Sequence, residues 1–116
     1  GKLELLISSF RDPVFGTMIT CGAGGNLAEL IDDVALERAP LSRDQAMAML
    51  GRLKLVQRLD KIDQDADIGA LADFIVQFSA LSAAIPWRGF VLEINPVKWR
   101  GNRVVAVDGL LLINQV

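Results

Sequence analysis

The stretch that decides the fold of this 116-residue chain runs from Glu93 to Asp108 and reads EINPVKWRGNRVVAVD. Its two halves have the composition of short strands, and the Gly101-Asn102 pair between them is a favoured two-residue hairpin turn. If this pair forms the turn, Arg100 lies opposite Arg103. The sequence therefore predicts a closing antiparallel hairpin, which we expect to extend over residues 90–113.

The same turn predicts which polar side chains meet across the hairpin. Counting outwards places Asn95 directly opposite Asp108, and opposite residues have Cβ atoms roughly 5 Å apart. Glu93 joins them because alternate strand residues point to the same face. Carboxylate and amide oxygens form a donor set suited to Mg²⁺. The alternative is that Asn-Pro and Asp-Gly serve turns, with an aspartate that only hydrogen-bonds to backbone.

A second candidate site is the glycine-rich stretch Gly22-Ala23-Gly24-Gly25. Successive glycine amides can form a concavity for phosphate oxygens, which makes Gly22, Gly24 and Gly25 candidates for phosphate binding. A tight hairpin that needs glycine for its dihedral angles is the alternative. The stretch also lacks the Lys and Ser/Thr of a P-loop.

Two charged residues near this stretch are further candidates. Arg38 can meet a phosphate because guanidinium geometry matches that anion, and a surface ion pair with Glu37 or Asp33 is the alternative. Glu29 can orient the glycine stretch or bind metal, and a solvent-facing glutamate at a strand edge is equally compatible.

Two helices are predicted in the middle of the chain. Ser42 and Gln45 form a capping box, so one helix begins there. Asp67 caps a second helix, whose apolar stripe ends before Pro86. Residues 54–65 form a connector of uncertain structure. Strand patterns cover residues 3–9, 17–21, 28–31 and 34–37. The sequence therefore predicts an α+β fold, a mainly antiparallel β-sheet packed against two helices.

Composition narrows the class of protein. The net charge is −2 with no long basic cluster, which argues against nucleic acid or an anionic membrane as a partner. No apolar run approaches the roughly 20 residues of a membrane span, and Glu4 interrupts any signal peptide, so we expect a cytoplasmic protein.

The single cysteine, Cys21, fits a reducing compartment and a small buried side chain. A mean hydropathy of +0.37 favours contact with a neighbouring lobe or subunit, including a homo-oligomer.

The chain contains no histidine. A Ser-His-Asp or Cys-His nucleophile and a His-based zinc site are therefore excluded within it. Any chemistry carried by these residues is electrostatic, and we expect no catalytic residue in this chain.

Several motifs in one order resemble the ATP-grasp part of NDP-forming acyl-CoA synthetases, the group related to the succinyl-CoA synthetase β subunit. They are RDPVFG at Arg11–Gly16, GAGG at Gly22–Gly25 with Glu29, DVA at Asp33–Ala35, RAPL at Arg38–Leu41, EINP at Glu93–Pro96 and VAVD at Val105–Asp108. The chain departs from the family pattern over Arg52–Asp63 and at Lys98-Trp99-Arg100, so the acid substrate class is left open.

The resemblance implies that residues 1–116 are a single domain, the C-terminal lobe of an ATP-grasp fold. It implies Mg²⁺ bound by Asn95 and Asp108 with Glu93, and ATP or ADP as the nucleotide, with CoA bound elsewhere in a larger protein. A carboxylic acid, CoA and ATP would give acyl-CoA, ADP and phosphate through an acyl phosphate and a phosphohistidine. The expected partners are the remaining ATP-grasp lobe and a CoA-binding domain. The alternative is a catalytically silent lobe with a regulatory or scaffolding role.

Overall fold

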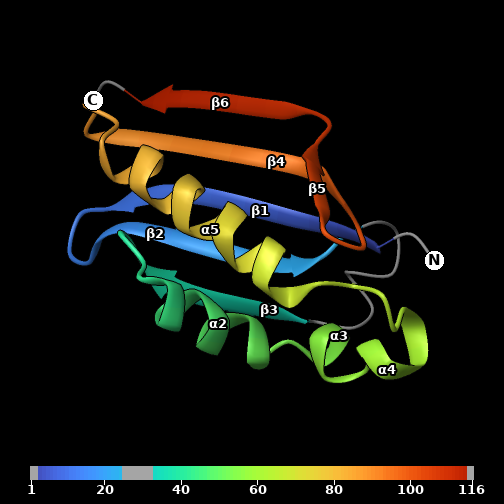
Figure 1. The fold of residues 1–116 in the computed structure, drawn as a ribbon. Coiled ribbons are helices and arrows are strands. Elements are labelled where there is room, and N and C mark those ends of the chain that lie inside the picture. Colours follow the sequence, from blue (N-terminus) through green and yellow to red (C-terminus); the bar gives the residue numbers. More distant parts are fainter. Residues whose placement is uncertain (1–2, 25–32, 115–116) are drawn as a thin grey trace.

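The computed structural model of the chain describes residues 3–24 and 33–114. In the described residues an antiparallel sheet carries helices on one face (Figure 1). The elements, in chain order, are β1 (Leu3–Asp12), β2 (Gly16–Ala23), β3 (Val34–Arg38), α2 (Arg43–Gly51), α3 (Lys54–Gln57), α4 (Leu59–Ile62), α5 (Ile68–Ala83), β4 (Gly89–Arg100), β5 (Arg103–Ala106) and β6 (Gly109–Asn114).

The strands lie in the order β3-β2-β1-β4-β5, and β6 also pairs with β4. Every strand pair is antiparallel. The predicted α+β class with an antiparallel sheet is therefore confirmed. The strands predicted over residues 3–9, 17–21 and 34–37 are present, and β1, β2 and β3 each extend at least one residue beyond them. The strand predicted over residues 28–31 lies outside the described residues.

The core lies between the sheet and the helices α2 and α5. Alternate residues of the central strands point into it, because side chains in a strand alternate between the two faces. The side chains with no exposed surface include Leu5, Ile7, Ile19, Cys21, Val97 and Trp99 from the sheet, Met49 and Leu50 from α2, and Leu71 and Ile75 from α5. Packing of α5 on this face holds the centre of the sheet in place. We call the opposite face of the sheet the outer face.

Both helices begin at the predicted caps. The Ser42 hydroxyl accepts a hydrogen bond of 3.1 Å from the Gln45 N–H, and the Gln45 side chain accepts one of 2.8 Å from the Ser42 N–H. The Asp67 carboxylate accepts one from the Ala70 N–H at 3.2 Å. These bonds satisfy amide donors that have no partner within the helix.

The connector over residues 54–65 contains the short helices α3 and α4. Leu53 precedes α3 and provides no side-chain cap. The cap comes instead from the buried Asp33, which is distant in sequence. Its carboxylate accepts hydrogen bonds from the N–H groups of Lys54 at 2.7 Å and Leu55 at 2.9 Å. Asp33 therefore ties the beginning of β3 to α3.

The RDPVFG motif forms the connection between β1 and β2. The Arg11 guanidinium donates to the carbonyl oxygens of Ile85, at 2.8 Å, and of Trp87, just beyond the C-terminal end of α5. The Asp12 carboxylate accepts the N–H groups of Val14 and Phe15 at 2.7 and 2.9 Å. The motif therefore holds a tight turn and anchors the end of α5 to the sheet.

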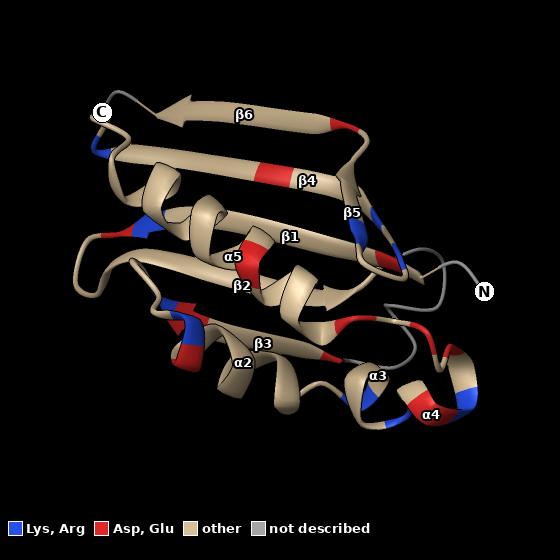
Figure 2. Cartoon of the chain, in the orientation of Figure 1, with Lys and Arg blue, Asp and Glu red and all other residues tan. Residues whose placement is uncertain are grey.

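Large apolar side chains are exposed on the outer face and along β6. They include Val34, Leu36, Val91, Leu110 and Leu112. Charged residues gather instead around α3, α4 and the β4–β5 hairpin and at the start of α2, and β6 is nearly free of them (Figure 2). Within the described residues, no helix is both long and apolar enough to cross a membrane.

Candidate functional site

The closing hairpin has the predicted register. Arg100 pairs with Arg103 around the turn at Gly101 and Asn102. Beyond the end of β5, the Asn95 N–H donates to the Asp108 carbonyl oxygen at 3.1 Å, so these two residues lie opposite each other. The same register continues into β6, where Glu93 pairs with Leu110. β5 and β6 therefore continue one line of pairing along β4.

A β-bulge lies in β4 at the candidate metal residues. Ile94 pairs with Ile7 of β1, but Val97 pairs with Leu5, so β4 has one residue more than β1 over this interval. The extra length falls at Asn95 and Pro96, whose peptide bond is cis. Bulges re-aim side chains and are frequent near active sites. Here the bulge takes Asn95 out of the pairing with β1.

The structure brings the three predicted metal residues to one hollow. Glu93, Asn95 and Asp108 line it together with Gly109 and Leu110, and its volume is about 210 Å³. Glu93 and Asn95 come from β4, Asp108 comes from the link just before β6, and all three side chains are partly or fully exposed. Solvent can therefore reach the hollow and complete the coordination of an ion held there.

The donor set in this hollow fits Mg²⁺ chemically. It contains two carboxylates and an amide oxygen, which are hard oxygen ligands. Neither the Glu93 nor the Asp108 carboxylate has a basic partner within 4.0 Å among residues 3–24 and 33–114. In that part of the chain no three acidic, histidine or cysteine side chains gather at one point, so a third protein ligand would be Asn95. One Asp108 oxygen also accepts its neighbour's N–H, from Gly109 at 2.8 Å.

Gly22 and Gly24 lie where other backbone approaches closely. A Cβ at Gly22 would be 2.9 Å from the Asp33 carbonyl oxygen, and one at Gly24 would be 3.0 Å from the Leu5 carbonyl carbon. Neither glycine has a positive φ. Both are therefore needed for their small size in the packing of β1, β2 and β3.

The amide of Gly24 is already used within the fold. It donates a 2.8 Å hydrogen bond to the Glu4 carbonyl oxygen. Gly25 and Glu29 lie outside the described residues. Nucleotide binding by Gly22, Gly24 and Gly25 stays a prediction.

Arg38 is exposed at the end of β3, and neither acidic alternative pairs with it. Glu37 binds Arg52 at 3.0 Å, and Asp33 binds the α3 amides. Arg38 lines a separate hollow that also contains Arg88. β3 and β4 are separated by β2 and β1, which places Arg38 at least roughly 14 Å from Glu93. The structure therefore does not bring Arg38 and the metal candidates into one small site.

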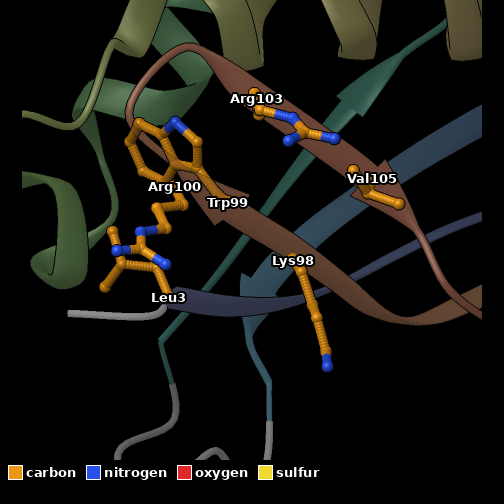
Figure 3. Close-up of a pocket in the computed structure, with 6 residues that line it drawn as sticks. All are labelled: Leu3, Lys98, Trp99, Arg100, Arg103 and Val105. Atoms are coloured by element: carbon orange, nitrogen blue, oxygen red, sulfur yellow. The ribbon is translucent and has the colours of Figure 1, made fainter.

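The β4–β5 hairpin carries a hollow of about 150 Å³ with a mainly apolar wall, lined by Leu3, Lys98, Trp99, Arg100, Arg103 and Val105 (Figure 3). Its basic side chains extend in different directions and do not converge on one point (Figure 3). This arrangement is unlike the convergent donors of the Glu93 hollow.

Cys21 is buried in the core, as predicted. Burial, and to a smaller degree the charge of Asp33, raises the pKa of its thiol to about 12. The thiolate needed for nucleophilic chemistry is therefore absent near neutral pH.

Sequence reasoning missed two polar residues on the outer face, Ser8 and Thr20. Their hydroxyl groups bond to each other across β1 and β2. No local signal separates them from other strand serines and threonines. Only the pairing of β1 with both β2 and β4 places them beside Glu93.

The fold belongs to a known class of protein. A family profile described as an ATP-grasp domain matches residues 1–113 of the chain. The chain therefore belongs to the ATP-grasp family.

Within this family the chain is similar to ADP-forming acid–CoA ligases. It is 33% identical over 117 residues to acetate–CoA ligase [ADP-forming] I of Archaeoglobus fulgidus, covering 99% of this chain and 17% of that protein. It is 30% identical over 112 residues to the β subunit of acetate–CoA ligase [ADP-forming] I of Pyrococcus furiosus, covering 95% of this chain and 48% of the subunit.

A solved structure with the same fold comes from Ca. Korarchaeum cryptofilum. It is dinucleotide-forming acetyl-coenzyme A synthetase 1, in complex with coenzyme A and Mg-AMPPCP. The TM-score is 0.86 at 28% identity, covering 97% of this chain and 53% of that one. The chain thus spans about half, or less, of the proteins that it matches.

Proposed function

We propose that this chain is the Mg²⁺- and nucleotide-phosphate-binding lobe of an ADP-forming acid–CoA ligase. The observation that carries the proposal is the shared hollow of Glu93, Asn95 and Asp108. The names of its relatives support ligation of a carboxylic acid to CoA with formation of ADP. Residues 1–116 would then be one domain, the C-terminal lobe of the ATP-grasp fold.

The hairpin would hold the ion through two fixed ligands. Asn95 offers its amide oxygen and Asp108 the carboxylate oxygen that Gly109 does not engage. The backbone bond between them sets their spacing, and Glu93 acts as a third ligand or orients the other two. When bound, Mg²⁺ neutralises charge on the phosphate oxygens during in-line transfer. The role of these protein residues is therefore to position the ion against the phosphate groups.

Arg38 is the stronger of the candidate nucleotide contacts. Its guanidinium has no acidic partner in the described part of the chain, and it lies on the same outer face as Glu93. At that separation it would meet a part of the nucleotide or of another phosphorylated group remote from the ion. Gly22, Gly24 and Gly25 remain weaker candidates, because the amide of Gly24 already has a partner.

Other segments must supply the rest of the reaction. The chain has no histidine to carry a phosphoryl group, so that residue would lie outside it. We expect the remaining ATP-grasp lobe and a CoA-binding domain as partners. The exposed apolar side chains on the outer face, among them Val34, Leu36 and Val91, support a covering partner there.

The test is a set of substitutions in the full-length protein that contains this chain. Asp108→Asn and Asn95→Ala should lower ATP-dependent acyl-CoA formation at least about 100-fold, because each removes an oxygen ligand or its charge. Asp60→Asn, an exposed change on α4, is the matched control and should leave the rate unchanged. Circular dichroism verifies that each variant is folded. Wild-type rates in both hairpin variants would reject the catalytic assignment and favour a silent regulatory lobe.

A further inference from the structure

A row of directly opposed residues crosses the outer face of the sheet. Leu36 of β3 pairs with Thr20 of β2, Thr20 pairs with Ser8 of β1, and Ser8 pairs with Glu93 of β4. Directly opposite residues of antiparallel strands point to the same face. Two hydroxyl groups therefore lie in line with a carboxylate of the candidate metal site.

Side-chain contacts confirm the orientation of this row. The hydroxyl groups of Ser8 and Thr20 form a hydrogen bond with each other. The next residue, Ser9, points to the other face, where its hydroxyl accepts a 2.8 Å bond from Ser82 of α5. Ser8 and Ser9 thus offer the same chemical group to opposite sides of one strand.

The Ser8–Thr20 pair has an unused donor. Two hydroxyl groups carry two hydrogens, and only one of them can lie between the two oxygens. The structure gives neither side chain a second hydrogen-bond partner among the described residues. Both residues are half-buried, so a group that accepts the second hydrogen must come from solvent or from a ligand over the sheet.

The nearest such ligand would be one bound beside Glu93. The Cβ atom of Glu93 lies roughly 5 Å from the Cβ atom of Ser8, as in any directly opposed pair. Glu93 in turn shares a hollow with Asn95 and Asp108. Ser8 and Thr20 do not line this hollow themselves, but the pairing of Ser8 with Glu93 places the hydroxyl pair next to Glu93, on the side of β1.

We propose that Ser8 and Thr20 are positioning residues of this site, with their spare hydroxyl hydrogen donated to an oxygen of the metal-bound ligand. The oxygen belongs to a water of the ion or to a nucleotide phosphate, and both are acceptors of the same kind. The inference rests on the proposed function, because it takes the ion to be held by Glu93, Asn95 and Asp108.

Mn²⁺ binding to the full-length protein, followed by electron paramagnetic resonance with and without ADP, tests the inference. Mn²⁺ binding by Asp108→Asn measures the ions bound elsewhere on the protein. The Mn²⁺ that wild type binds in addition is assigned to the candidate site. Ser8→Ala and the double variant Ser8→Ala, Thr20→Val should weaken binding at this site about three- to tenfold, the effect of one lost hydrogen bond.

Ser9→Ala is the matched control. It breaks the buried bond to Ser82 and should lower the thermal midpoint while leaving Mn²⁺ affinity unchanged. Ser8→Ala should weaken Mn²⁺ binding and lower the thermal midpoint less than Ser9→Ala does, because its bond to Thr20 is only half-buried. A purely structural role for Ser8 would instead move the thermal midpoint and not the affinity.

The two conditions identify the oxygen. Weaker binding both with and without ADP assigns it to a metal-bound water, and weaker binding only with ADP assigns it to a phosphate. Wild-type affinity in the Ser8 variants under both conditions, with Asp108→Asn still losing the ion, would overturn this inference alone. Unchanged binding in Asp108→Asn would overturn the proposed metal site itself.

Discussion

The backbone N–H of Asn95 donates to the carbonyl oxygen of Asp108 at 3.1 Å. This bond lies between the paired segments β4–β5 and β4–β6, so one register runs along the whole hairpin. The positions of the candidate ligands therefore depend on the turn that sets this register, at Gly101 and Asn102.

Gly101→Ala should destabilise the protein by about 1–2 kcal/mol. Gly101 has a φ of +58°, and an L-residue with a Cβ pays roughly this cost in the left-handed region. Urea unfolding followed by circular dichroism measures the change. Gly51→Ala at the end of α2 is the control, since its Cβ would meet no atom within 4 Å and alanine favours helix. Equal effects of the two variants would contradict the explanation.

Arg11→Ala should cost about 2–3 kcal/mol of unfolding free energy. The guanidinium bridges two carbonyl groups beyond α5, and it lies 4.8 Å from the centre of the Phe90 ring. Arg11→Lys should recover only part of the loss, because an ammonium group cannot reproduce the fork.

Arg43→Ala is the comparison for Arg11. Its ion pair with Asp73 is exposed on both sides, so we expect less than about 1 kcal/mol. An equal loss of unfolding free energy in Arg43→Ala and Arg11→Ala would contradict the view that the contact of Arg11 with the end of α5 stabilises the fold more than a surface ion pair does.

Asp12 should contribute to the acid sensitivity of the fold. Hydrogen bonds from the N–H groups of Phe15 and Val14 hold the pKa of its carboxyl below its usual range. A lowered pKa in the folded state means that the stabilisation is present above the unfolded pKa and is lost as pH falls through the folded value.

Asp12→Asn keeps an oxygen acceptor for the turn but removes the charge. The unfolding free energies of wild type and variant should therefore differ most near neutral pH and converge as the pH falls through the lowered pKa of Asp12. A difference that does not change with pH would contradict the role of the Asp12 charge.

Cys21 should be inert in the folded protein. Its buried thiol, with a pKa of about 12, should not react with a disulfide reagent such as DTNB at pH 8. One equivalent should react at once after unfolding in urea. Rapid labelling of the native protein would show that β2 opens to solvent.

Local signals were sufficient for much of the fold. The Gly101-Asn102 pair predicted the hairpin register, and the caps at Ser42 and Asp67 predicted where two helices begin. Because Asn95 and Asp108 lie on one hairpin, their spacing along the chain was enough to predict that they meet.

Features that join distant parts of the chain were not predicted. The bulge in β4 depends on pairing with β1, and the contact of Arg11 with the end of α5 depends on packing between elements far apart in the sequence. The alignment of Ser8 with Glu93 has the same origin. Sequence spacing carries no information about such pairings until the strand order is known.

The unbroken register of the hairpin makes chain length there as important as residue identity. Because strand side chains alternate with a period of two, one residue inserted between Asn95 and Asp108 would turn the carboxylate toward α5 and away from its amide neighbour. Two inserted residues would keep its face but move it by one pleat repeat, roughly 7 Å along β4. Engineering of this hairpin would therefore have to exchange side chains at constant length.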